Sequence, residues 1–238
     1  MNAISEGRAP ESPAELAERL GLTFSNLSLL SRALTHRSYM NENPDVLEDN
    51  ERLEFLGDAV LDFIVGAWVY QHCPEMDEGY LTRVRSALVR NEQLAEFARR
   101  LELGAALKMG RGEETSGGRD RDSLLGSTFE ALLGALFLDS GLASVERFIE
   151  PLLGLVQDQV IGRFEIYDPK SRFQVWAQAQ KLGTPRYVLV SSSGPEHAKI
   201  FEIEVRIRDQ AYGRGKGPSK QVAEQVASQI ALESLGIA

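Results

Sequence analysis

Residues 50–70 read NERLEFLGDAVLDFIVGAWVY, and this stretch decides the fold of the first half of the chain. Its apolar residues recur every three or four positions, which predicts a helix with a buried side. Its acids are spaced by three, four and four residues and therefore share one helix face: Glu51, Glu54, Asp58 and Asp62. Like charges at this spacing repel one another, so helix stability does not explain them.

A second apolar segment, residues 124–138, has Glu130 as its single ionisable residue. A carboxylate on a buried helix is costly unless it is paired, protonated or bound to a cation. For Glu130 alone, a structural ion pair and a metal site are equally open, because the sequence offers three basic partners: Arg52, Arg83 and Arg85.

Acids on two apolar helices together favour a magnesium site. Mg²⁺ takes oxygen ligands and is usually shared between protein carboxylates and a substrate phosphate. A di-iron helical bundle would instead need Glu-x-x-His pairs. The histidines of the chain never follow a glutamate at that spacing, which excludes this class: His36, His72 and His197.

The organisation of the chain changes after about residue 160. Before it, apolar residues keep a helical spacing, and Ser12-Pro13-Ala14-Glu15 is typical of a helix start. After it, the pattern predicts a helix, three strands and a helix, at 171–182, 186–190, 201–207, 210–215 and 220–235. We expect a multidomain chain with an all-α domain at 12–156, a linker at 157–166 and a small α+β (α-β-β-β-α) domain at 167–237.

The net charge of −9 is unevenly distributed. Residues 1–164 hold 27 acidic and 16 basic residues, whereas residues 165–238 hold 8 acidic and 10 basic residues. Phosphate binding would therefore use a locally basic face of the second domain. The single Cys73 excludes an internal disulfide, and the sequence has no apolar membrane span and no signal or transit pattern. We expect a cytoplasmic protein with no membrane partner.

The stretch Asn50–Leu61, NERLEFLGDAVL, resembles the signature helix of the ribonuclease III family. The resemblance continues through Asp77–Gly79 (DEG), Arg83–Val89 (RVRSALV) and Phe129–Ala135 (FEALLGA), and it covers about residues 15–155. The C-terminal domain resembles the RNA-binding appendage of the same family. The resemblance implies an all-α endonuclease domain followed by a small α+β double-stranded-RNA-binding domain.

The resemblance also implies roles for the acids. Glu54 and Glu130 match metal ligands, and Asp58 and Glu130 match the residues whose loss abolishes catalysis. Glu51 and Glu78 match acids that line the cleft and assist. The implied cofactor is Mg²⁺, with Mn²⁺ able to substitute and no organic cofactor. Such a metal makes a nucleophile of bound water near neutral pH and stabilises charge on the scissile phosphate.

Two further positions follow from the resemblance. The residue three before Glu130 is usually an aspartate at the metal, but here it is Ser127, which adds no charge to the site. This departure puts tight metal binding in doubt more than the reaction class. Phe55 matches an aromatic residue that plugs into the partner subunit of a homodimer. The alternative is that Phe55 packs in its own core.

Duplex RNA is bound through 2′-hydroxyls and phosphates, because its bases lie in a deep major groove. Gln174 and Gln178 lie at helical spacing with Ser171 on the first helix of the second domain. The resemblance implies that these three residues face a minor groove. His197 belongs to a loop that matches a second minor-groove contact. Lys220 opens the last helix, whose N-terminal dipole favours a phosphate.

We expect an endoribonuclease that cleaves double-stranded RNA by metal-dependent phosphodiester hydrolysis, leaving 5′-phosphate and 3′-hydroxyl ends. Its partners would be double-stranded RNA and a second copy of the chain, and its substrates would be structured ribosomal, messenger and transfer RNA precursors. The alternative is a double-stranded-RNA-binding protein whose cleavage is weakened or lost because of Ser127. A purely structural helical protein explains neither the signature helix nor the second domain.

Overall fold

The acid-bearing helix predicted at residues 50–70 is α4 (Glu51–His72), and it packs against α9 (Asp122–Ser140). The computed structural model describes residues 11–74, 76–167, 169–195 and 198–237. The chain divides into two units between Val156 and Gln157. Among the described residues, no helix is long and apolar enough to cross a membrane.

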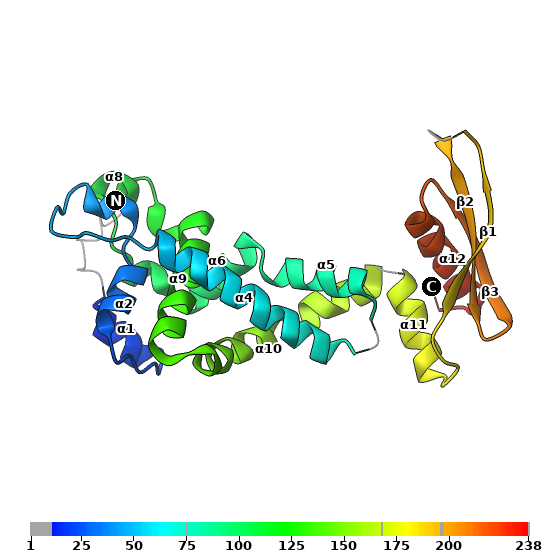
Figure 1. Ribbon diagram of the computed structural model, residues 1–238, viewed down its shortest axis with the longest axis horizontal. Helices are drawn as coiled ribbons and strands as arrows, with labels where there is room; N and C mark the ends of the chain where they lie inside the picture. The colour runs from blue at the N-terminus through cyan, green and yellow to red at the C-terminus, as the bar shows by residue number, and fades with distance from the viewer. Residues whose placement is uncertain (1–10, 75, 168, 196–197, 238) are drawn as a thin grey trace, which may run out of the picture. The chain divides into compact units, whose positions relative to one another are not determined.

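The first unit is helical (Figure 1). Ser12 begins it with the predicted cap, in which its side chain and that of Glu15 bond reciprocally to each other's backbone N–H. Helix α9 is buried almost all round, so it forms the centre of this unit. The other elements are α1 (Pro13–Arg19), α2 (Leu27–Ala33), α3 (Arg37–Met40), α5 (Glu78–Leu88), α6 (Asn91–Arg100), α7 (Leu103–Ala106), α8 (Arg111–Thr115), the 3-10 turn η1 (Gly118–Asp120) and α10 (Leu142–Tyr167).

The connection predicted at 157–166 is helical, because α10 continues as far as Tyr167. Leu153, Val156 and Val160 are buried at helical spacing, so the apolar pattern that starts α10 extends past the division between the units. The polar residues interspersed among them conceal this spacing in the sequence.

The second unit has the predicted α-β-β-β-α order: α11 (Pro169–Ala179), β1 (Arg186–Ser193), β2 (Ile200–Ile207), β3 (Gln210–Gly217) and α12 (Lys220–Ser234). The strands form an antiparallel sheet in the order β1-β2-β3. Alternate residues of β2 are buried at Ile203, Val205 and Ile207, and Phe173 of α11 belongs to the same core. The predicted fold class is confirmed for both units.

Helix α12 lies directly on the backbone of β3. A Cβ placed on Gly213 or Gly215 would collide with the α12 backbone at Ala227. The helix presents small alanines to the strand, so the two backbones touch without intervening side chains. This contact fixes the N-terminal end of α12, which carries Lys220, relative to the sheet.

Candidate active site

Two glycines bring the acid-bearing helices into contact. A Cβ on Gly57 of α4 would collide with the backbone carbonyl of Glu130, and a Cβ on Gly134 of α9 would collide with the carbonyl of Leu53. The helices therefore cross with their backbones touching, at the turn that carries the acids. Glu54 and Asp58 flank Gly57 in the sequence and so lie beside Glu130, which is 72 or more positions away in the chain.

Glu130 is held in an unfavourable environment for a negative charge. Burial, together with the negative charges of Asp58, Glu54 and Asp62, raises the pKa of its carboxyl to about 7. Within the described part of the chain no basic side chain forms an ion pair with Glu130, so the structural salt bridge left open by the sequence is not formed. An acid kept unpaired among three others is typical of a cation site or a catalytic group.

Ser127 connects the two helices. Its hydroxyl donates a hydrogen bond to Glu54, with 2.8 Å between Oγ and Oε1. The serine therefore lies beside the Glu54 carboxylate. It fixes the orientation of Glu54 without adding a charge to the site.

The two acids expected to assist, Glu51 and Glu78, are exposed. Glu51 is exposed and pairs with Arg37, with 3.3 Å between Oε1 and Nη1. Glu78 is exposed at the first residue of α5, directly after the cap residue Asp77. Neither is among the charges that raise the pKa of Glu130, whereas Asp62 is, although it was not among the predicted site residues. Its spacing of four residues from Asp58 was the available signal.

The donor set fits a hard divalent cation with few protein ligands. Among the described residues, no group of three or more His, Cys, Asp or Glu side chains is close enough to surround one ion. Mg²⁺ does not need such a group, because it keeps several waters and binds through one or two carboxylates plus substrate phosphates. Glu54 and Glu130 supply such a pair of carboxylates, and the unpaired, destabilised charge of Glu130 is what a cation would neutralise.

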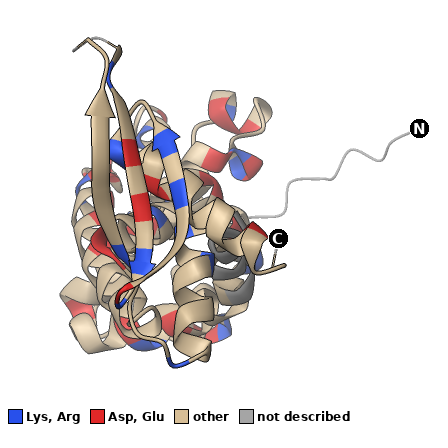
Figure 2. Ribbon diagram, turned by 90° about the vertical axis from the view of Figure 1, so that its right-hand side faces the viewer, with Lys and Arg blue, Asp and Glu red and all other residues tan. Residues whose placement is uncertain are grey.

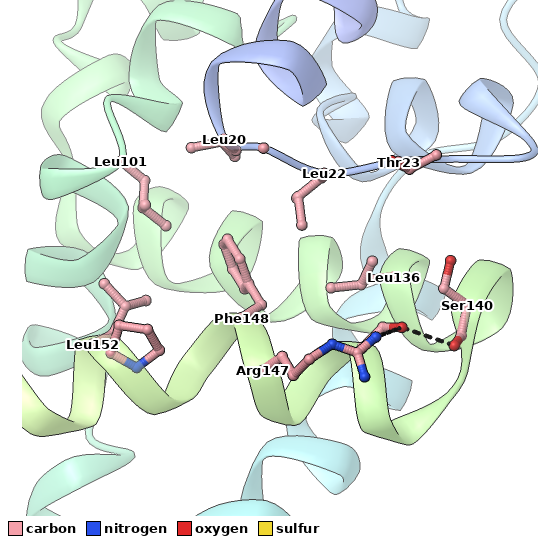
Figure 3. Close-up of a pocket in the computed structure, with 12 residues that line it drawn as sticks. Leu20, Leu22, Thr23, Leu101, Leu136, Ser140, Arg147, Phe148 and Leu152 are labelled. Atoms are coloured by element: carbon pink, nitrogen blue, oxygen red, sulfur yellow. Dashed lines mark hydrogen bonds between the residues drawn. The ribbon is translucent and has the colours of Figure 1, made fainter.

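A cavity of about 530 Å³ lies elsewhere in the helical unit (Figure 3). It is lined mainly by apolar side chains such as Leu22, Phe148 and Leu152, with Arg147 and Ser140 at one end. None of the predicted site residues lines it. The carboxylates are thus not part of this cavity, and the site is defined by the helix crossing alone.

Comparison with known families agrees with this geometry. A model described as Ribonuclease-III-like matches residues 26–154, which include both acid-bearing helices, and a double-stranded RNA binding motif matches residues 169–235. The chain belongs to the ribonuclease III family.

Curated relatives match nearly the whole chain. Ribonuclease 3 of Roseiflexus sp. (strain RS-1) is 48% identical over 94% of this chain and 96% of its own length. Ribonuclease 3 of Geobacter sulfurreducens is 47% identical over 92% of this chain and 89% of its own length. The solved structure of the nuclease domain of ribonuclease III from Campylobacter jejuni is 36% identical, with a TM-score of 0.55. The match covers 59% of this chain and 94% of the solved chain.

In this ribonuclease III chain, Phe55 is 79% exposed, so packing in its own core is ruled out. It shares one broad side of α4 with two other aromatic residues that are more than half exposed, Phe63 and Tyr70. This aromatic side lies next to the acid face of the same helix. Large exposed apolar surfaces of this kind mark interaction sites.

The predicted contact residues of the double-stranded-RNA-binding motif differ in their exposure to solvent. Gln174 and Gln178 are half-buried on α11, and Gln178 Nε2 has no hydrogen-bond partner among the described residues. Ser171 is only 4% exposed near the start of α11. His197 lies outside the described residues.

Lys220 is exposed at the first residue of α12, where Ser219 caps the helix by accepting a hydrogen bond from the N–H of Val222. The outer face of the sheet is less suited to phosphate, because acids on β2 face bases on β3 (Figure 2). Glu204 pairs with Arg214 at 2.8 Å, and Glu202 pairs with Lys216 at 3.6 Å. Arg214 and Lys216 lie beside acids of the neighbouring strand, whereas Lys220 has no ion-pair partner among the described residues and is better placed for RNA.

Proposed function

We propose that this chain is an endoribonuclease that hydrolyses phosphodiester bonds of double-stranded RNA, leaving 5′-phosphate and 3′-hydroxyl ends. One observation carries the proposal: the Gly57–Gly134 crossing brings Glu54 and Asp58 against an unpaired Glu130. The RNA-binding motif that follows in the same chain supplies the substrate class. Structured precursors of ribosomal, messenger and transfer RNA contain such duplexes and are the proposed natural substrates.

Glu54 and Glu130 would hold Mg²⁺, with Mn²⁺ as a substitute. The bound cation supplies positive charge to the scissile phosphate and lowers the pKa of water at the site. A cation held there would favour the ionised carboxylate of Glu130, whose pKa is about 7 without it. Ser127 keeps the Glu54 carboxylate oriented through its hydrogen bond. Asp58 would act beside the scissile phosphate.

We propose a homodimer through the aromatic side of α4. Phe55, Phe63 and Tyr70 expose an apolar strip on a helix that also carries the catalytic acids. A second copy covering this strip would place two sites near each other, one for each strand of a duplex. The solved nuclease domain from Campylobacter jejuni is described as having a region involved in dimer formation, which agrees with this assignment.

The decisive experiment incubates the full chain with a long RNA duplex, with magnesium or with a chelator. We expect cleavage only with magnesium, and fragments that carry 5′-phosphate and 3′-hydroxyl ends. The Asp58→Asn and Glu130→Gln variants should each lose cleavage while binding the duplex within a few-fold of the unchanged protein. Magnesium-dependent cutting by purified Glu130→Gln would refute the site assignment.

A double-stranded-RNA-binding protein without cleavage is not favoured. Glu54, Asp58 and Glu130 are all retained and brought together at an energetic cost that duplex binding by the second unit does not require. In the same experiment, duplex binding without magnesium-dependent cleavage by the unchanged protein would identify this alternative.

A further inference from the structure

Arg37 is a basic side chain placed at the end of the row of acids on α4. Its guanidinium contacts Glu51, with 3.3 Å between Nη1 and Oε1, and within the described residues it has no other partner. The Arg37 side chain is nevertheless 71% exposed, so most of its five N–H donors face solvent. An exposed pair of this kind contributes at most about 1 kcal/mol to stability, so structure alone does not account for Arg37.

The backbone around Arg37 is firmly held. Thr35 accepts a hydrogen bond from the N–H of Asn50, the cap residue of α4, with 2.9 Å between O and N. His36 donates its N–H to the carbonyl of Lys108, also at 2.9 Å. The guanidinium therefore projects from a fixed point beside the start of α4. With the backbone held, only the side-chain torsions of Arg37 have to be ordered when a ligand binds.

Arg111 lies on another segment of the chain, which is hydrogen-bonded to the residue that follows Arg37. The N–H of Gly110 donates to Ser38 Oγ at 2.9 Å, so the start of α8 lies against α3. The Arg111 side chain is 93% exposed, and its Nε is 3.8 Å from Glu42 Oε2, which is too long for a hydrogen bond. Two exposed guanidinium groups, each with one acidic partner among the described residues, thus stand on adjacent segments, and Arg37 contacts the acid row of α4.

Arg37 and Arg111 lie in a unit that is otherwise strongly acidic. Residues 1–164 carry 27 acids against 16 bases, so the nuclease unit as a whole repels a polyanion. Glu51 and Asp58 are seven residues apart on α4, which corresponds to roughly 10 Å along a helix axis. A phosphate held by Arg37 would therefore lie a short distance along the strand from the reacting phosphate.

We propose that Arg37 and Arg111 form a phosphate-binding surface of the nuclease unit, which holds the RNA backbone beside the catalytic acids. This inference rests on the proposed function and adds the residues that position the substrate there. The guanidinium group offers parallel N–H donors that match phosphate oxygens, so a phosphate competes effectively with the exposed Glu51 carboxylate. RNA binding would replace the Arg37–Glu51 contact by an Arg37–phosphate contact.

The test compares Arg37→Gln with Arg100→Gln in the full chain. Arg100 is a suitable control because it is an exposed arginine of the same unit, paired with Glu96 on α6. Duplex binding is measured with a chelator over a range of salt concentrations, and cleavage kinetics with magnesium. Thermal melting establishes that both variants fold like the unchanged protein.

We expect Arg37→Gln to weaken duplex binding several-fold and to reduce the slope of log K against log salt by about 1, as for the loss of one phosphate contact. KM should rise by the same factor while kcat stays near its original value. Arg37→Lys should restore the slope, because it keeps the charge. In the Arg37→Gln/Arg111→Gln double variant, the slope of log K against log salt should be reduced by about 2.

If Arg37→Gln and Arg100→Gln behave alike while the unchanged protein binds and cleaves duplex RNA, the inference is wrong and the proposed function stands. If the unchanged protein neither binds nor cleaves duplex RNA, the proposed function fails and the inference fails with it.

Discussion

Glu130 is the residue whose ionisation is most strongly altered by folding. Its pKa of about 7 in the folded protein lies above the ordinary value of 4.5, so the folded state holds the proton more tightly than the unfolded state. The stabilising effect of this proton is complete below pH 4.5 and is lost as the pH rises through 7. Above pH 7 the ionised carboxylate opposes folding unless a cation binds it.

The loss of stability with rising pH gives a prediction for Glu130→Gln. Without divalent metal, the melting temperature of the unchanged protein should fall relative to that of the variant as the pH rises from 4.5 to 7.5, because glutamine cannot ionise. Magnesium should reduce this difference. Thermal melting across the pH range measures it, with Glu146→Gln on α10 as a surface control. Parallel curves for all three proteins would contradict the unpaired state of Glu130.

Ser127 offers a second test at the same site. Ser127→Asp replaces the hydrogen bond to Glu54 by a charged ligand on the same turn as Glu130. The magnesium concentration for half-maximal cleavage should fall by about tenfold to a hundredfold. The melting temperature of the variant should also rise more steeply with magnesium than that of the unchanged protein, because the cation relieves the added repulsion.

Magnesium titrations of activity and of thermal melting decide the outcome for Ser127. Ser127→Ala is the matched control, since it removes the hydrogen bond without adding a charge. Equal midpoints and parallel melting shifts for the serine and aspartate proteins would mean that residue 127 is not at the metal.

The close contact between helices α4 and α9 can be tested by substituting its glycines. Gly57→Ala should destabilise the nuclease unit by about 1–3 kcal/mol or more, because the added methyl group collides with the carbonyl of Glu130. Gly66→Ala on the same helix is the control, since its nearest atom would be Arg85 Cδ at 3.8 Å. That variant should be as stable as the original or up to about 1 kcal/mol more stable. Denaturant unfolding measures both, and equal destabilisation would exclude the close crossing.

The order of elements could be predicted because each pattern is local. The spacing of acids in Glu51–Asp62 and the alternation in β2 are properties of single segments, and both gave the correct element. The pairing of Ser127 with Glu54 could not be predicted without the resemblance, because it joins residues 73 positions apart. The burial of Ser171 was missed for the same reason, since burial depends on neighbours from other segments.

At the scale of the whole molecule, the aromatic side of α4 predicts self-association. Phe55→Glu should shift the protein from dimer toward monomer without loss of helix content, because the side chain is 79% exposed and contributes little to its own core. Coordinated cutting of both strands should decrease. Sedimentation and circular dichroism measure the two effects, with Leu27→Glu as the control, an exposed apolar residue carried by α2. An unchanged sedimentation rate would exclude this interface.

The glycine crossing also determines when the centre can exist during synthesis. A nascent chain that has reached α8 already displays Glu54 and Asp58, but it has neither Glu130 nor Gly134. Its acids are then only a solvated face of one amphipathic helix. Closing the long intervening loop requires α9 to leave the ribosome, because non-local contacts form only once both partners are available. The nascent chain therefore cannot form a complete catalytic centre until more than half of it has been made.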